Sequence, residues 1–202
     1  MTAPLFNRVS FILLFITFWV IRAYYVRRTR DPNAPRTRAE RREAMKREGI
    51  SGILLVVLTP IELVIILIYA WGPVWMNWAD LVFPIWIYWL GVVLMVVSIP
   101  LMGWVHRTLG KHYSYALETK EEQMLVTTGP YGRVRHPLYS AHNLFNLGMV
   151  LLTAYIPLVV FAVIGVPITY LRMKDEERMM MEQFGSKYEE YMKKTGRIFP
   201  KL

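Results

Sequence analysis

The residues best suited to chemistry lie in two segments of the second half of the chain. The first is the run GPYGRVRHPLY, in which Arg135, His136 and Tyr139 follow a Gly-Pro turn. Pro137 is placed to begin a helix, where its missing N–H is harmless. The backbone N–H groups of that helix start, together with Arg135 and His136, would bind an anionic group. The simpler alternative is a basic flank beside a membrane segment, with a histidine that has only protein partners.

The second segment is RMKDEERMMMEQFGSKYEEYMKKTGRIFPKL, which begins at Arg172. Arg172 and Glu176 are four residues apart and therefore share a helix face. Gly185 indicates a helix break. Two interpretations stay open: an amphipathic surface helix with an exposed Arg172–Glu176 ion pair, and a helix whose first turn lines a site.

A few polar residues interrupt the otherwise apolar stretches. They are Glu62, His142, Asn143 and Asn146. The spacing of four between His142 and Asn146 predicts that both point into a helix bundle. An ionisable group at membrane depth is a functional candidate. Satisfied packing is an equal alternative for His142, and a structural or cavity-lining role is favoured for Glu62.

Long apolar stretches must position these residues, and they indicate an all-α, multi-pass integral membrane protein. The chain has 202 residues, of which 54% are hydrophobic and 19% charged. The stretch Pro137–Leu171 is uncharged and, at about 1.5 Å per residue, too long for one span. It predicts a helical hairpin that turns near Thr153–Pro157. The expected domain is single, with a catalytic part at 106–202 and five spans at 5–26, 50–71, 81–105, 137–154 and 156–172.

The distribution of basic residues predicts the orientation. With five spans, 22 of the 24 Lys and Arg residues fall on one side, which the positive-inside rule makes cytoplasmic. The N-terminus is then outside and the C-terminus cytoplasmic. The basic run Arg27–Arg47 is interpreted as an orientation signal that contacts anionic lipids. Nucleic-acid binding is not expected, because no aromatic residues interleave those charges.

Several kinds of site are excluded or unsupported. The chain has no cysteine, which excludes disulfides, Cys-ligated metals and thiol nucleophiles. With four histidines, a metal site is possible in principle but lacks a supporting pattern, and we expect none. The GxxxxGK[ST], HExxH and GxSxG motifs are absent.

The two segments resemble the isoprenylcysteine carboxyl methyltransferase family, which is related to the integral-membrane phospholipid methyltransferases. The resemblance covers about Leu109 to Pro200, and the short chain is similar to the prokaryotic members, which would place it in the cell membrane. It implies S-adenosylmethionine as cofactor, in a cytoplasmic pocket closed by the C-terminal segment, which is expected to end in an amphipathic helix. The implied cofactor residues are Gln123, Met124, Leu125, Val126, Tyr131, His136, Pro137, Leu138, Tyr139 and Glu176, with Arg135 beside them.

The resemblance also implies a function. Arg172 matches the position that contacts the substrate carboxylate, so the expected reaction is carboxyl O-methylation of an isoprenylcysteine or a similar lipophilic acid. The acceptor would enter from the bilayer. Gln123 stands where a histidine is usual, and Ala116 roughly where a cofactor-contacting glutamine is usual. N-methylation of a phospholipid amine, S-methylation of a small thiol, and a non-enzymatic lipid-binding or transport protein are the alternatives.

Overall fold

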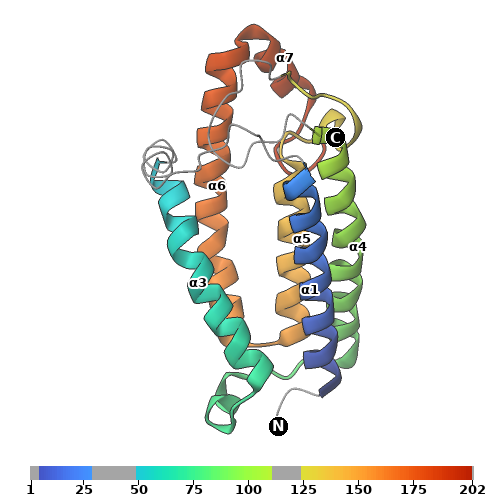
Figure 1. Cartoon of the computed structure of the whole chain (residues 1–202), viewed down its shortest axis with the longest axis vertical. Helices are drawn as coiled ribbons and strands as arrows, with labels where there is room; N and C mark the ends of the chain where they lie inside the picture. Colours follow the sequence, from blue (N-terminus) through green and yellow to red (C-terminus); the bar gives the residue numbers. More distant parts are fainter. Residues whose placement is uncertain (1–4, 29–48, 111–123, 202) are drawn as a thin grey trace.

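The fold is a bundle of long helices (Figure 1). The computed structural model describes residues 5–28, 49–110 and 124–201, and Gln123 and Ala116 lie outside these ranges. The described part holds two isolated β-bridges and no β-strand. Its helices are α1 (Leu5–Arg28), α3 (Gly49–Trp71), η1 (Val74–Ala79), α4 (Ile85–Leu109), η3 (Gly129–Gly132), α5 (Pro137–Thr153), α6 (Ile156–Phe184) and α7 (Ser186–Lys194).

The predicted all-α membrane architecture is confirmed. Four described helices, α1, α3, α4 and α6, are long and apolar enough to cross a membrane. The fifth expected span, α5, has 17 residues. At about 1.5 Å per residue it is some 25 Å long, somewhat short of a ~30 Å hydrocarbon core. It nevertheless runs beside α1 and α4 in the bundle (Figure 1).

Two helices, α4 and α6, differ from the predicted spans by four residues or more. Helix α4 begins at Ile85, four residues later than expected, because Pro84 occupies its N-cap and the preceding residues form η1 and a bridge. Helix α6 does not end at residue 172 but continues to Phe184, so the apolar span and the charged segment form one helix. The predicted break at Gly185 is confirmed, with φ +52° at that glycine.

The predicted hairpin between α5 and α6 is confirmed. The turn consists of Ala154 and Tyr155, and Ala154 takes the left-handed conformation, with φ +47°. The backbone N–H of Leu81 donates to the Ala154 carbonyl at 2.7 Å, and Asp80 bridges Tyr155. This turn and η1 therefore lie at one end of the bundle, and the starts of α3 and α5 lie at the other (Figure 1).

Helices α4 and α5 approach closely because glycine faces glycine. A Cβ on Gly91 would lie 2.6 Å from the backbone nitrogen of Leu152, and one on Gly148 would lie 2.7 Å from the Gly91 carbonyl oxygen. Small residues at such crossings let two membrane helices pack backbone to backbone. On the α1 side, Phe18 stacks on Phe145 with ring centroids 4.0 Å apart. This packing fixes which side of α5 is buried.

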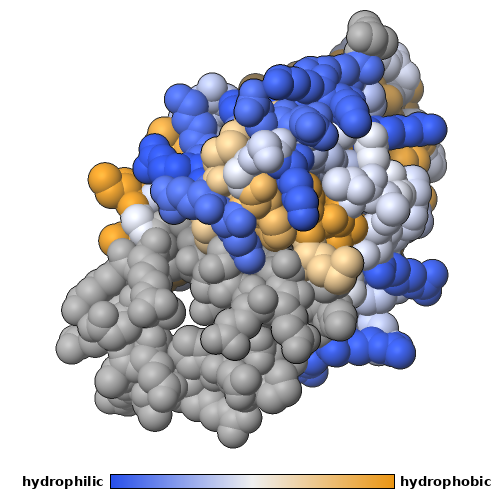
Figure 2. Space-filling model, turned by 90° about the horizontal axis from the view of Figure 1, so that it is seen from above, coloured by the Kyte–Doolittle hydropathy of each residue, from blue (hydrophilic) through white to orange (hydrophobic). Residues whose placement is uncertain are grey.

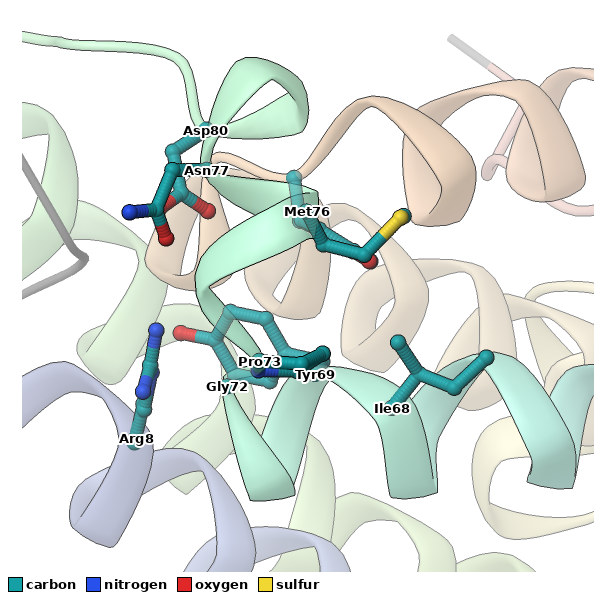
Figure 3. A pocket seen from close by; sticks show the side chains of 9 residues that line it. Arg8, Ile68, Tyr69, Gly72, Pro73, Met76, Asn77 and Asp80 are labelled. Atoms are coloured by element: carbon teal, nitrogen blue, oxygen red, sulfur yellow. The ribbon is translucent and has the colours of Figure 1, made fainter.

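The end of the bundle that carries η1 has a small polar cavity (Figure 3). Arg8, Tyr69, Asn77, Asp80 and Tyr155 contribute to its lining. Its volume is about 10 Å³. Pockets for small molecules hold roughly 300–1,000 Å³. A cofactor site must therefore be sought elsewhere, and the opposite end of the bundle has the required side chains.

Candidate functional site

Both chemistry-bearing segments meet at the end of the bundle where α5 begins. Seen from that end, hydrophilic side chains crowd the surface, with apolar ones showing between them (Figure 2). Helix α6 brings three consecutive carboxylates there, Asp175, Glu176 and Glu177. Successive helix residues point about 100° apart, so the three carboxylates point in different directions. Asp175 accepts a hydrogen bond from Ser51 of α3 at 2.8 Å, and the other two face the start of α5.

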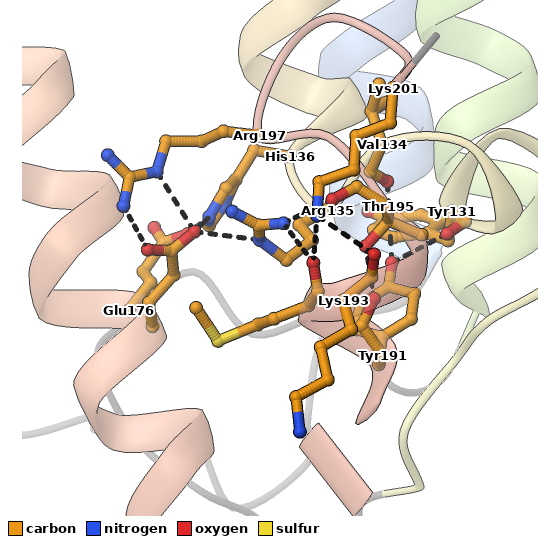
Figure 4. Close-up of polar contacts among 12 residues, drawn as sticks. Tyr131, Val134, Arg135, His136, Glu176, Tyr191, Lys193, Thr195, Arg197 and Lys201 are labelled. Carbon is orange, nitrogen blue, oxygen red and sulfur yellow. Dashed lines mark hydrogen bonds and ion pairs between the residues drawn. The ribbon is translucent and has the colours of Figure 1, made fainter. Parts of the chain in front are cut away.

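Glu177 is the centre of a buried charge network, and its cationic partners Arg135, His136 and Arg197 are labelled in Figure 4. Its Oε1 lies 2.9 Å from Arg135 Nε, 3.3 Å from His136 Nε2 and 3.1 Å from Arg197 Nε. A second Arg197 nitrogen donates to Oε2. The side chain of Glu177 is only 8% exposed. Three cationic groups therefore occupy this carboxylate, which leaves it little capacity for a ligand.

Glu176 is the more accessible carboxylate. Tyr139 donates its hydroxyl to Oε1 at 2.5 Å, and His136 Nδ1 lies 3.3 Å from Oε2. Arg172 Nε is 3.6 Å from Oε1. The Glu176 side chain is 28% exposed, whereas that of Arg172 is 6% exposed. A cationic ligand could therefore reach Glu176 without displacing the network around Glu177.

The C-terminal segment closes this network. It pairs with the residues before α5: the N–H of Arg135 donates to the Gly196 carbonyl at 2.9 Å, and that of His136 to the Arg197 carbonyl at 3.0 Å. Ser140 adds a hydrogen bond to the Ile198 carbonyl at 2.7 Å. A Cβ on Gly196 would lie 1.6 Å from the Phe199 carbonyl oxygen, so this tight turn requires glycine. The segment therefore holds Arg197 against Glu177.

The environment of His136 raises its pKa above the ordinary value. Burial alone lowers the pKa of this imidazole, but hydrogen bonds and charge from Glu176 and Glu177 outweigh that effect. The neighbouring charged and titratable groups are these two carboxylates and four further side chains. Arg135 and Arg197 share Glu177, Arg172 lies beside Glu176, and Tyr139 is on the next turn of α5. His136 therefore keeps its proton to a higher pH than an ordinary histidine does.

The raised pKa predicts a pH-dependent stability. Because the folded pKa lies above the unfolded value of about 6.5, stabilisation by His136 is complete below that pH. It is lost as the pH rises through the folded pKa. We expect the difference in melting temperature between the wild type and His136→Gln to be largest below pH 6.5 and to shrink at alkaline pH. Thermal unfolding in detergent from pH 5.5 to 9 measures it, and a difference that widens with pH contradicts it.

The structure brings several of the predicted site residues together. Arg135, His136, Tyr139, Arg172 and Glu176 converge as described. Pro137 begins α5 as predicted and is buried, and Leu138 is half-buried beside it. Of the other predicted residues, Met124 is 66% exposed, Leu125 and Val126 are half-buried, and Tyr131 is buried.

One feature of the site differs from the sequence-based expectation. Arg135 and His136 were expected to bind an anionic group, and in the structure they face the carboxylates of α6. Arg135 also donates to the Thr195 carbonyl at 2.5 Å and the Met192 carbonyl at 3.3 Å. The protein's own groups thus hold Arg135, whose place in the site is a positioning one. Tyr131 accepts the Tyr191 hydroxyl at its carbonyl, at 2.6 Å, which ties η3 to α7.

Sequence reasoning did not identify Glu177 and Arg197 as site residues. A signal was present: Arg135, His136 and the arginine of TGRIFP need a carboxylate partner, and Glu177 follows Glu176 directly. The structure agrees with the prediction that His142 points into the helix bundle. It packs edge-to-face on Phe18 of α1, and its Nδ1 lies 3.0 Å from the Leu138 carbonyl. His142 is thus part of the bundle packing.

Comparison with known proteins identifies the family. Residues 86–187 match the sequence profile described as Phospholipid methyltransferase. The match covers α4, α5, α6 and the carboxylates of the site. The chain belongs to this family. In agreement with that membership, it is an integral, multi-pass membrane protein.

The chain is also similar to individual proteins of several kinds. It is 32% identical over 94 residues to the protein-S-isoprenylcysteine O-methyltransferase of Schizosaccharomyces pombe, covering 45% of this chain and 40% of that protein. It is 25% identical over 115 residues to the nickel-cobalt-cadmium resistance protein NccN of Alcaligenes xylosoxydans xylosoxydans, covering 56% and 53%. The chain thus spans about half the length, or less, of these relatives.

A solved structure has the same fold. It is the eukaryotic intramembrane Ras methyltransferase ICMT, with a TM-score of 0.56 and 17% sequence identity over 95% of this chain and 67% of that one. The likeness extends through the N-terminal helices, for which the sequence offered only hydrophobicity. The family resemblance proposed from the two motifs is therefore confirmed.

Proposed function

We propose that the protein transfers a methyl group from S-adenosylmethionine to a lipophilic acceptor in the membrane. The observation that supports this proposal most directly is the position of Glu176. This accessible carboxylate lies among Tyr139, His136 and buried Arg172 at one end of the membrane helices. Family membership supports the same chemistry. The unit is a single domain, residues 1–202, with the catalytic part at 106–202 and α5 as its fifth span.

The residues present fit the proposed cofactor. S-adenosylmethionine would supply a methyl group on a positively charged sulfur, and it also carries an ammonium and a carboxylate. Glu176 offers the charge that its cationic groups need, and Tyr139 and His136 fix the orientation of that carboxylate. The segment 123–126, Tyr131 and the first residues of α5, Pro137 and Leu138, complete the proposed surroundings.

The favoured acceptor is a carboxylate, as in a C-terminal isoprenylcysteine. A carboxylate with a reference pKa of about 3.3–3.7 is already ionised at pH 7, so no general base is required. Arg172 would orient the acceptor through charge-assisted hydrogen bonds. Its burial removes water that would otherwise weaken the nucleophile. The acceptor oxygen would take the methyl group and the cofactor sulfur would keep the electron pair of the broken bond, so no residue of this chain would have to move a proton.

Two measurements test the function. S-adenosylhomocysteine at millimolar concentration should raise the melting temperature of the detergent-solubilised protein. A labelled-methyl assay should then give an alkali-labile ester with a prenylated cysteine, but no product with an aminophospholipid or a small thiol. The absence of any thermal shift contradicts the cofactor assignment. If the labelled methyl group appears on the aminophospholipid or on the thiol instead, the acceptor is an amine or a thiol and not a carboxylate.

The orientation yields a separate prediction. We propose that the end with His136 faces the cytoplasm, because the helix ends that border the Lys- and Arg-rich parts of the sequence lie there. A reporter enzyme that works only outside the cytoplasm should therefore be active when it is fused after Asp80. A reporter that works only inside the cytoplasm should be active when it is fused after Lys201. Both reporters on the same side would contradict the arrangement. A third fusion after Arg28 should behave like the one after Lys201.

A further inference from the structure

The small cavity at the η1 end of the bundle collects polar groups from four parts of the chain (Figure 3). Arg8 comes from α1, Tyr69 from α3, and Tyr155 from the turn before α6. Asn77 of η1 and Asp80, which follows η1, complete the set. The volume of the cavity, about 10 Å³, is close to the space that one water molecule needs.

Both tyrosine hydroxyls at this cavity are enclosed by the protein. Tyr69 and Tyr155 are each 2% exposed. Within the described residues, no hydrogen bond reaches either hydroxyl, and none reaches Arg8 Nε, which is also enclosed. A buried polar group without a hydrogen-bond partner is destabilising. Three such groups around one cavity therefore indicate a partner that they share.

These side chains are packed too firmly to turn toward other partners. The Tyr69 ring packs edge-on against Phe11 of α1, with ring centroids 5.4 Å apart, and its centroid lies 5.3 Å from that of Tyr155. The Arg8 guanidinium carbon lies 5.9 Å from the centre of the Tyr69 ring. A Cβ on Gly72 would lie 1.7 Å from Arg8 Nη1, so the guanidinium is confined on that side by the backbone of Gly72. The shared partner must therefore be a small molecule that enters the cavity.

The charges around the cavity favour an uncharged occupant. Arg8 carries a positive charge at neutral pH and Asp80 a negative one, so the two charges sum to zero. An ion in addition to this pair would leave an uncompensated charge in a partly buried site, which is unfavourable. A buried water molecule typically makes about three hydrogen bonds to polar groups that lack other partners. Size, charge and hydrogen-bonding capacity thus agree on water.

We infer that this cavity binds one water molecule. The water accepts hydrogen bonds from Arg8 Nε and from one tyrosine hydroxyl, and it donates to the other hydroxyl. It thereby links α1 and α3 to the turn before α6. The hydrogen bond from the Leu81 N–H to the Ala154 carbonyl ties the same turn to the segment after η1. The inference does not depend on the proposed methyl transfer, because the cavity lies at the end of the bundle opposite the start of α5 (Figure 1).

Removing each hydroxyl tests the inference by the sign of the effect. If the hydroxyls bind water, Tyr69→Phe and Tyr155→Phe should each lower the melting temperature in detergent by about 2–4 °C, because each loses a hydrogen bond. If the hydroxyls have no partner, each substitution removes an unfavourable buried group and leaves the melting temperature unchanged or raises it. Tyr24→Phe is the control. Its side chain is 54% exposed, so the melting temperature should change by about one degree or less.

A double variant and an experimental structure complete the test. Because both hydroxyls bind the same water, Tyr69→Phe combined with Tyr155→Phe should lower the melting temperature by clearly less than the sum of the two single decreases. A structure at a resolution that shows ordered water should have one solvent peak about 2.5–3.0 Å from both hydroxyl oxygens. No peak in such a structure, additive single effects, or an increase in melting temperature overturns the inference.

The same measurements distinguish water from an ion. Exchange of chloride for gluconate, or of sodium for a large organic cation, should change the melting temperatures of the wild type and of Tyr155→Phe equally. A melting temperature that depends on one of these ions in the wild type but not in Tyr155→Phe would show that the cavity binds that ion. This result would overturn the assignment to water.

Discussion

Glu177→Gln is expected to destabilise the protein strongly. The substitution keeps the shape of the side chain but removes the negative charge that Arg135, His136 and Arg197 share. Breaking a buried ion pair from one side destabilises a protein by about 3–5 kcal/mol, because the remaining charge is left uncompensated. For a chain of this size, that corresponds to a decrease in melting temperature of roughly 10 °C. Thermal unfolding in detergent at pH 7 measures the effect.

The control for this prediction is Glu189→Gln on α7. Glu189 also pairs with a cation, Lys193, at 2.9 Å, but the two side chains are 56% and 69% exposed. Solvent screens an exposed pair, so its loss should change the melting temperature very little. If Glu177→Gln and Glu189→Gln melt within two degrees of each other, the network around Glu177 is not the structural centre of the site.

Release of the C-terminal segment should accompany the loss of stability. Arg197 is held by Glu177, and its carbonyl accepts the N–H of His136. In Glu177→Gln, trypsin should therefore cut the peptide bond after Arg197 faster than it does in the wild type. Mass spectrometry of the cleaved protein identifies the site. Unchanged cleavage together with a large decrease in melting temperature would place the damage elsewhere in the bundle.

The parts of the fold predicted from sequence are those set by local rules. Hydrophobic length predicted where α1, α3, α4 and α6 run, proline predicted the starts of α5 and α6, and Gly185 predicted the end of α6. These features depend on a few neighbouring residues. Residue 172, the predicted end of the last span, is not the end of a helix for a related reason: the change from apolar to charged residues marks the edge of the membrane, but it does not interrupt a helix.

The parts of the site that could not be predicted depend on long-range contacts. The spacing of Arg172 and Glu176 showed a shared face, but not that Arg172 is buried beneath it. The choice between Glu176 and Glu177 depends on the direction from which α5 and the C-terminal segment approach α6. A helix turn of about 100° separates the two side chains, and only the packed structure decides which one is enclosed.

Arg172→Lys and Glu176→Gln are expected to impair different steps of the proposed reaction. Arg172 would hold the acceptor carboxylate, and lysine cannot reproduce its planar, two-pronged contact. Turnover should therefore fall by two orders of magnitude or more, while affinity for S-adenosylhomocysteine stays within a few-fold. Glu176→Gln removes the charge offered to the cationic cofactor. It should weaken cofactor binding at least tenfold, measured by calorimetry, since charge-assisted hydrogen bonds contribute about 1.5–3 kcal/mol.

A charge-reversed double variant separates this assignment from a simple ion pair. If Arg172 and Glu176 only stabilise each other, Arg172→Glu combined with Glu176→Arg restores the pair and should retain activity. The structure argues against that result. Glu176 accepts the Tyr139 hydroxyl and lies beside His136, and an arginine in its place can accept no hydrogen bond and faces a second cation. The double variant should thus be inactive, and normal turnover would remove both residues from the site.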